Sequence, residues 1–153
     1  MTFHRNDGGR ASDGISGSSG DCVVRAIAIA TGRDYRQVHD MVNEAIREAP
    51  LRGRRAARRE AGAWGARKGV PKDIVRSLMA ELDWEWHPTM GIGSGCRVHL
   101  RADELPGGTI ICQVSRHLVA VIDGVIHDTR DPSRNGTRCV YGYWTDPVAG
   151  VRS

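Results

Sequence analysis

The stretch that decides the fold is SRHLVAVIDGVIHDT, residues 115–129. Two apolar, β-branched runs flank Asp123-Gly124, and a two-residue Asp-Gly loop between such runs is a strong signal for a β-hairpin. Alternate residues of a strand share a face. His117 and Asp128 are therefore predicted to be diagonal neighbours on one face, within reach of each other. The predicted cross-strand pairs are Ile122–Val125, Val121–Ile126, Ala120–His127, Val119–Asp128 and His117–Arg130.

Before this hairpin, the chain has helical patterns. Residues 22–31 are apolar almost throughout and lie between Asp21, a good N-cap, and Gly32, which is well suited to end a helix. A short buried helix is predicted here, with a buried strand as the alternative. Amphipathic helices are predicted for residues 35–49 and for the segment that follows Pro71 and ends near Leu82.

After residue 83 the pattern changes to short β-forming runs separated by Gly, Pro, Asp and Asn. The predicted strands are 84–86, 96–100, 109–115, 117–122, 125–129 and 139–144. Helices followed by strands indicate an α+β fold, with N-terminal helices packed on a C-terminal antiparallel β-sheet. Residues 1–20 are predicted to be a flexible N-terminal arm. Residues 21–153 are predicted to form a single domain with a helical part (21–83) and a β-sheet part (84–153).

The composition is that of an ordinary globular protein: 153 residues, 40% hydrophobic and 26% charged. No apolar run approaches the roughly 20 residues that span a bilayer, and the first residues lack the apolar segment of a secretory signal. A cytoplasmic location without membrane contact is therefore expected. In a reducing compartment, the four cysteines are expected to be thiols, ligands or a nucleophile rather than disulfides (Cys22, Cys96, Cys112 and Cys139).

The net charge of +4 is concentrated in one segment. Residues 52–68 hold seven basic residues and one acid, Glu60. This Arg-rich segment is predicted to lie in a solvated connector over residues 51–69, a loop with some helix. Nucleic-acid binding is the alternative role for it, with Trp64 as a possible stacking residue.

Cys96 and His99 have half of a zinc-like spacing, which Cys112, Cys139 or His127 could complete. The sequence has no second pair of this kind, and in a strand Cys96 and His99 would point to opposite faces. No metal and no other cofactor are therefore expected.

Cys22 is placed for nucleophilic chemistry. A cysteine at a helix N-terminus has a lowered pKa, because the helix dipole and the free N–H groups favour the thiolate. Such a nucleophile needs a base, and the base needs an orienting group. His117 and Asp128 are predicted to fill these two roles, with Asp131 as an alternative orienting residue.

Two stretches, GDCVVRA (residues 20–26) and residues 115–129, together resemble a compact bacterial or phage-type member of the papain-like cysteine peptidase superfamily. The resemblance implies a helical subdomain on an antiparallel sheet, with the cleft between them. It assigns Cys22 as nucleophile, His117 as general base and acid, and Asp128 as the residue that orients His117.

The chain departs from the family pattern at two positions near Cys22. The family's glutamine, which donates to the oxyanion, is replaced by Ser16, and Val23 stands where a tryptophan often follows the cysteine. The candidate oxyanion donors are therefore the backbone N–H of Cys22 and one serine among Ser16, Ser18 and Ser19, with Ser16 at the matching position.

The expected function is a cysteine hydrolase that cleaves a peptide or isopeptide bond in a peptide or protein substrate through an acyl-enzyme. Acyl transfer to an amine is a close variant. The alternative, favoured by the missing glutamine, is a non-catalytic papain-like module that binds protein or nucleic acid through the Arg-rich segment 52–68.

Overall fold

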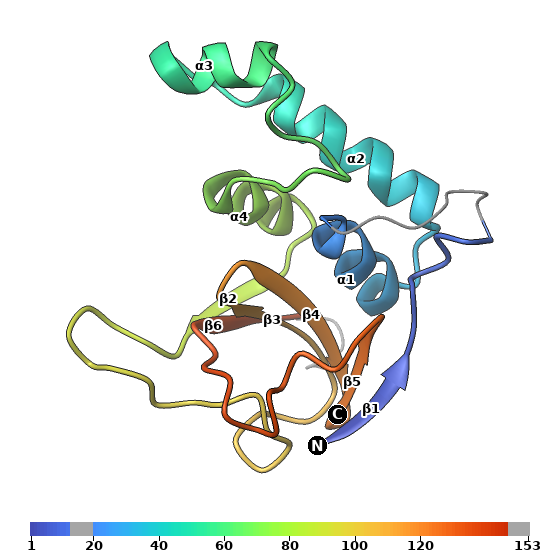
Figure 1. Ribbon diagram of the computed structural model, residues 1–153, viewed down its shortest axis with the longest axis vertical. Coiled ribbons are helices and arrows are strands. Elements are labelled where there is room, and N and C mark those ends of the chain that lie inside the picture. The colour runs from blue at the N-terminus through green and yellow to red at the C-terminus, as the bar shows by residue number, and fades with distance from the viewer. Residues whose placement is uncertain (13–19, 147–153) are drawn as a thin grey trace.

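A computed structural model of the chain describes residues 1–12 and 20–146. Four helices lie together above a curved six-stranded sheet (Figure 1). The helices are α1 (Cys22–Thr31), α2 (Tyr35–Glu48), α3 (Gly53–Glu60) and α4 (Lys72–Glu81). The strands are β1 (Thr2–Arg5), β2 (Glu85–Pro88), β3 (Thr109–Val114), β4 (His117–Ile122), β5 (Val125–Asp128) and β6 (Gly142–Thr145). None of the helices in the described part of the chain is both long and apolar enough to cross a bilayer.

The α+β class is confirmed, and so is the predicted hairpin. Ile122 pairs with Val125, Val121 with Ile126 and Ala120 with His127. Asp123 and Gly124 both have positive φ, 49° and 78°, as the two central residues of a tight type I′ turn require. The ladder between β4 and β5 stops at Ala120–His127, so the predicted pairs further from the turn, Val119–Asp128 and His117–Arg130, are not part of it.

The sheet has apolar side chains on both faces. On one face, Ile111, Leu118 and Trp144 pack into the larger core with the helices, and α1 lies directly on the sheet. On the other face, a second core is closed by residues from the long segment before β3, including Leu100. The two cores are separate because successive side chains of a strand point to opposite faces of the sheet.

The sheet is mixed rather than purely antiparallel. Its strand order is β1-β5-β4-β3-β6-β2, and β1 pairs in parallel with β5, from Thr2↔Val125 to Arg5↔Asp128. The prediction of a flexible arm over residues 1–20 is therefore wrong for residues 2–5. Edge pairing orders this polar segment, because the open backbone groups of β5 can pair with a strand of any composition.

One further prediction needs correction. Residues 96–100 do not form a strand, and only an isolated bridge joins His99 to Cys139. The helical part expected within the 51–69 connector is helix α3, residues 53–60, none of which is buried.

Cys96 and Cys139 form a disulfide, which contradicts the prediction of four unpaired cysteines. The bridge at His99 brings the two segments together and leaves the two Cα atoms 5.8 Å apart, within the usual range for a disulfide. Cys22 and Cys112 are free. Disulfides are rare in the cytosol, so this pair counts against the reducing compartment expected from the sequence.

Removal of this disulfide by the double substitution Cys96→Ser/Cys139→Ser is expected to lower the free energy of unfolding by about 2–4 kcal/mol, because the bond joins residues 43 positions apart. Urea unfolding measures the loss. Unreduced, denatured wild-type protein should titrate two thiols. Four thiols, or equal stability of the wild type with and without a reductant, would contradict the pairing.

Candidate active site

Cys22 is the first residue of α1 and is partly buried against the larger core. Asp21 occupies the N-cap position, but its side chain makes no capping hydrogen bond, contrary to the role predicted from the sequence. The first N–H groups of a helix have no partner within the helix. The N–H of Cys22 is therefore available to an incoming carbonyl oxygen.

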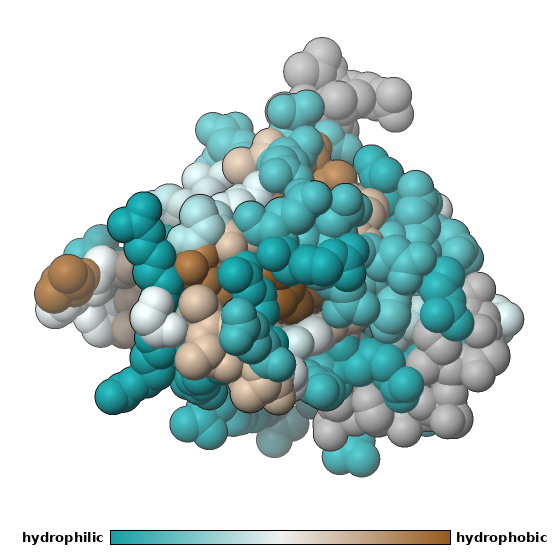
Figure 2. All heavy atoms as spheres, turned by 90° about the horizontal axis from the view of Figure 1, so that it is seen from above, coloured by the Kyte–Doolittle hydropathy of each residue, from teal (hydrophilic) through white to brown (hydrophobic). Residues whose placement is uncertain are grey.

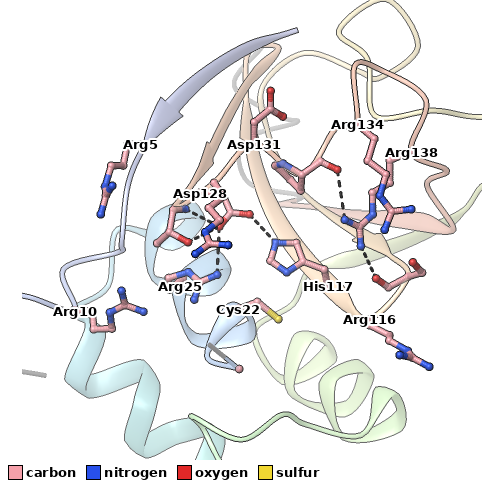
Figure 3. Close-up of a pocket in the computed structure, with 15 residues that line it drawn as sticks. Arg5, Arg10, Cys22, Arg25, Arg116, His117, Asp128, Asp131, Arg134 and Arg138 are labelled. Atoms are coloured by element: carbon pink, nitrogen blue, oxygen red, sulfur yellow. Dashed lines mark hydrogen bonds and ion pairs between the residues drawn. The ribbon is translucent and has the colours of Figure 1, made fainter. Parts of the chain in front are cut away.

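His117 begins β4 and Asp128 ends β5. The distance between Nε2 of His117 and Oδ2 of Asp128 is 2.6 Å, so the predicted diagonal contact is present. Strict alternation places both residues on the sheet face away from α1, together with Val119 and Ile126. Because they occupy strand ends, their side chains extend past the sheet toward α1, and the His117 ring lies between Asp128 and Cys22 (Figure 3).

Arg25, one turn along α1 from Cys22, connects the helix to this pair. Its Nη2 donates to Oδ1 of Asp128 at 3.2 Å, and its Nη1 donates to Asp21. Oδ1 of Asp128 also accepts the backbone N–H of Thr129 at 2.7 Å. One oxygen of Asp128 is thus held by the scaffold, which leaves the other oxygen for His117.

Asp21 is fully buried and has two further partners. Tyr35 donates its hydroxyl to Oδ2 at 2.8 Å, and Nη1 of Arg10 lies 3.1 Å from the same oxygen. Burial, followed by the hydrogen bond to Asp21, raises the pKa of Tyr35, so the hydroxyl stays protonated and remains a donor. The polar network therefore runs from α2 through Asp21, Arg25 and Asp128 to His117.

The charges of the site favour a thiolate–imidazolium pair. Burial alone would raise the pKa of Cys22, but the hydrogen bond and positive charge of His117, the Leu118 backbone N–H and the charge of Arg25 together lower it. Burial alone would lower the pKa of His117, but its contacts with Asp128 and Cys22 raise it to about 9. Burial opposes ionisation of Asp128 as well, but the hydrogen bond and charge of His117, the Thr129 N–H and the charge of Arg25 together keep the pKa of the carboxyl below its usual range.

The three residues open into a cleft of about 1080 Å³, whose lining includes Cys22, His117, Asp128 and seven arginines. Gly20, beside Cys22, also lines the cleft, and its φ is +102°. A Cβ at Gly20 would lie 2.8 Å from the backbone oxygen of Arg67. Only glycine fits at this position, where the chain passes between the cleft and the 67–68 backbone.

The structure therefore brings together Cys22, His117 and Asp128, as predicted. Asp131, the alternative orienting residue, lines the cleft, but its Oδ1 accepts the N–H of Ser133 and it makes no contact with His117 among the described residues. Ser16, the predicted oxyanion donor, lies outside the described residues, as do Ser18 and Ser19.

Sequence reasoning missed the supporting roles of Arg10, Arg25 and Tyr35, and it assigned Asp21 to helix capping alone. Arg25 had a visible signal, since it is the only charged residue in the apolar run CVVRAIAIAT, and a buried charge requires a partner. Arg10 and Tyr35 had no comparable signal, because their roles depend on contacts with Asp21, which is distant from them in the sequence.

No metal site emerges from the part of the chain that the structure describes. Within residues 1–12 and 20–146, no group of three His, Cys, Asp or Glu side chains is placed to hold a metal ion. Cys96 and Cys139, which were candidate zinc ligands, are not available for a metal because they are bonded to each other.

Comparison of the chain with family models, curated proteins and solved structures found no match. The site is therefore interpreted from its own geometry and charges.

Alkylation of Cys22 by iodoacetamide should persist well below pH 9.0, the ordinary thiol pKa, because His117 stabilises the thiolate. His117→Ala should move the midpoint of the pH profile upward, since burial raises the pKa of Cys22 and His117 no longer opposes that effect. Peptide mass mapping measures each cysteine separately. Cys112 is an internal control, because burial raises its pKa. A profile unchanged by His117→Ala would contradict the pairing.

Arg25→Met should lower the free energy of unfolding by about 3–5 kcal/mol, because it leaves the buried carboxylates of Asp21 and Asp128 without their shared cation. Arg33→Met is the matched control at an exposed position, and its effect should stay within about 0.5 kcal/mol. Urea unfolding compares the two. Equal losses would mean that Arg25 does not stabilise the network.

Proposed function

We propose that this protein is a cysteine hydrolase with a papain-like arrangement that cleaves a peptide or isopeptide bond. The observation that carries the proposal is the position of His117, between a helix-start thiol with a lowered pKa and a carboxylate 2.6 Å away. Acyl transfer requires a nucleophile, a base and an orienting group, each hydrogen-bonded to the next.

In the proposed reaction, the Cys22 thiolate attacks the carbonyl carbon, and the backbone N–H of Cys22 donates to the developing oxyanion. His117 gives its proton to the leaving amine as the C–N bond breaks, which leaves a thioester. His117 then takes a proton from water as the water attacks the thioester. The acid product leaves and the Cys22–His117 pair is restored.

The contacts of His117 support different roles for its two ring nitrogens. Nε2 faces Asp128, so Nδ1 is the nitrogen left for Cys22 and for the leaving group. Arg25 and Thr129 hold the other oxygen of Asp128. This support fixes the ring without drawing the carboxylate away from it.

A peptide library incubated with wild-type protein should yield new termini, and Cys22→Ala should yield none. On a cleaved peptide, His117→Ala should reduce kcat/KM by about 10²–10⁴-fold. His127→Ala is the matched control, because His127 lies in the same hairpin but contacts His4 and Asn6 instead. Mass spectrometry identifies the products. Cleavage that survives Cys22→Ala, or no cleavage by the wild type, would overturn the proposal.

The same assay separates hydrolysis from acyl transfer. With added glycinamide, a hydrolase should still release mainly the free acid, whereas an acyltransferase should release the amide. The masses of the two products differ.

The alternative role, binding through residues 52–68, has less support. Figure 2 shows the face that carries α2 and α3 covered mainly by hydrophilic side chains, but several of the basic ones have partners within the protein. Arg55 pairs with Asp73 at 2.7 Å, and Arg59 donates to the Ile46, Arg47 and Ala49 carbonyls at the end of α2. Lys68 donates to the Gly62 carbonyl. These contacts favour a structural role for the segment, and none of its residues lines the cleft around Cys22.

A further inference from the structure

The cleft around Cys22 is strongly cationic. Among the described residues, seven arginines and two aspartates line it. Arg10 and Arg25 are neutralised by Asp21 and Asp128. The other five arginines are Arg5, Arg116, Arg130, Arg134 and Arg138.

Four of these five have no counter-ion in the part of the chain that the structure describes. Arg5, Arg116, Arg130 and Arg134 are exposed, and within residues 1–12 and 20–146 none of them has an acidic side chain within ion-pair distance. The remaining acid of the cleft, Asp131, is held by the N–H of Ser133. The cleft therefore presents an excess of positive charge to whatever enters it.

Arg138 adds a partly buried charge to this set. Its Nη2 donates to the Ser115 carbonyl at 2.5 Å, so its guanidinium is held at the wall of the cleft. Burial, followed by the positive charge of Arg134, lowers the pKa of Arg138. Two guanidinium groups thus repel each other there, and a bound anion would relieve the repulsion.

The arginines come from separate parts of the fold. Arg5 ends β1, Arg116 lies in the β3–β4 turn, and Arg130 and Arg134 lie in the segment between β5 and β6. In Figure 3, Arg5 and Arg10 lie on one side of the Cys22–His117 pair, and Arg116, Arg134 and Arg138 lie on the other. The positive charge therefore flanks the reacting sulfur.

The backbone at two of these arginines is also unusual. Arg116 and Arg134 have φ of 56° and 52°, a conformation in which glycine or asparagine is easier to accommodate. Both residues lie in turns, which accounts for this conformation.

We propose that the cleft binds an acidic polypeptide, with Asp or Glu side chains on both sides of the amide bond that Cys22 attacks. The inference rests on the proposed function and names its substrate class. A polypeptide fits better than a nucleic acid, because thiolate chemistry acts on acyl carbons. In addition, no Trp, Tyr or Phe among the described residues lines the cleft, whereas single-stranded nucleic acids are bound by aromatic stacking platforms.

Binding is tested with the full chain carrying Cys22→Ala, so that a bound peptide is not consumed. The probes are fluorescein-labelled peptides of alternating Glu and Gly, matched peptides with Gln or Lys in place of Glu, and a labelled 20-nucleotide oligothymidine. Fluorescence anisotropy should show the Glu peptide binding at least about tenfold more tightly than the Gln peptide, with the preference weakening as salt is added.

The double substitution Arg116→Gln/Arg134→Gln should weaken binding of the Glu peptide by about 3–20-fold and leave binding of the Gln peptide unchanged. The matched control is Arg33→Gln/Arg47→Gln, which removes two exposed arginines outside the cleft. The control should bind the Glu peptide as the parent protein does.

The outcomes separate the two proposals. Equal binding of the Glu and Gln peptides, or tighter binding of the oligothymidine than of the Glu peptide, would overturn the acidic-polypeptide inference even if Cys22 proves catalytic. Absence of Cys22-dependent cleavage, with preferential binding of the Glu peptide retained, would overturn the proposed hydrolase and leave the cleft as an acidic-peptide site.

Discussion

The ion pairs that Arg25 makes with Asp21 and Asp128 are the constraint on which the site depends. The Arg25 guanidinium is almost fully buried, and it joins the start of α1 to the end of β5. A buried charge is costly without partners, so the packing of α1 on the sheet is favoured where the Arg25 guanidinium meets Asp128. That position also brings Cys22 to His117. The same contact that stabilises the packing therefore helps to place the Cys22 thiol.

The hairpin contributes the other half of the geometry. Its Asp-Gly turn fixes the register, and the register places His117 and Asp128 at adjacent strand ends. At a strand end a side chain has no neighbour beyond it, so it can reach past the plane of the sheet. This freedom lets two residues from the face opposite α1 meet a residue of α1. The cleft forms at this end of the sheet because the strands stop there.

Local signals carried most of the sequence prediction. The caps and apolar pattern of residues 22–31, the Asp-Gly turn and the diagonal His117–Asp128 contact are short-range features, and the structure contains all of the elements that they predict. The parallel pairing of β1 and the Cys96–Cys139 bond join residues far apart in the chain. No local sequence pattern predicts such long-range contacts. In the sequence, an edge strand of polar residues cannot be told from a loop. The cationic cleft was missed for the same reason, since its arginines are scattered along the sequence.

The pairing of β1 with β5 has a consequence for the order in which the chain is made. Residues 2–5 pair with residues 125–128, which are made much later than they are (Figure 1). Such a long-range contact forms late, because a long loop must close before it is made. The wall of the cleft that holds Arg5 is therefore completed only after residue 128 has left the ribosome. A nascent chain carries the thiol of Cys22 long before it carries the imidazole of His117, so the pKa of Cys22 is lowered only after the strand that holds His117 has been made and has folded.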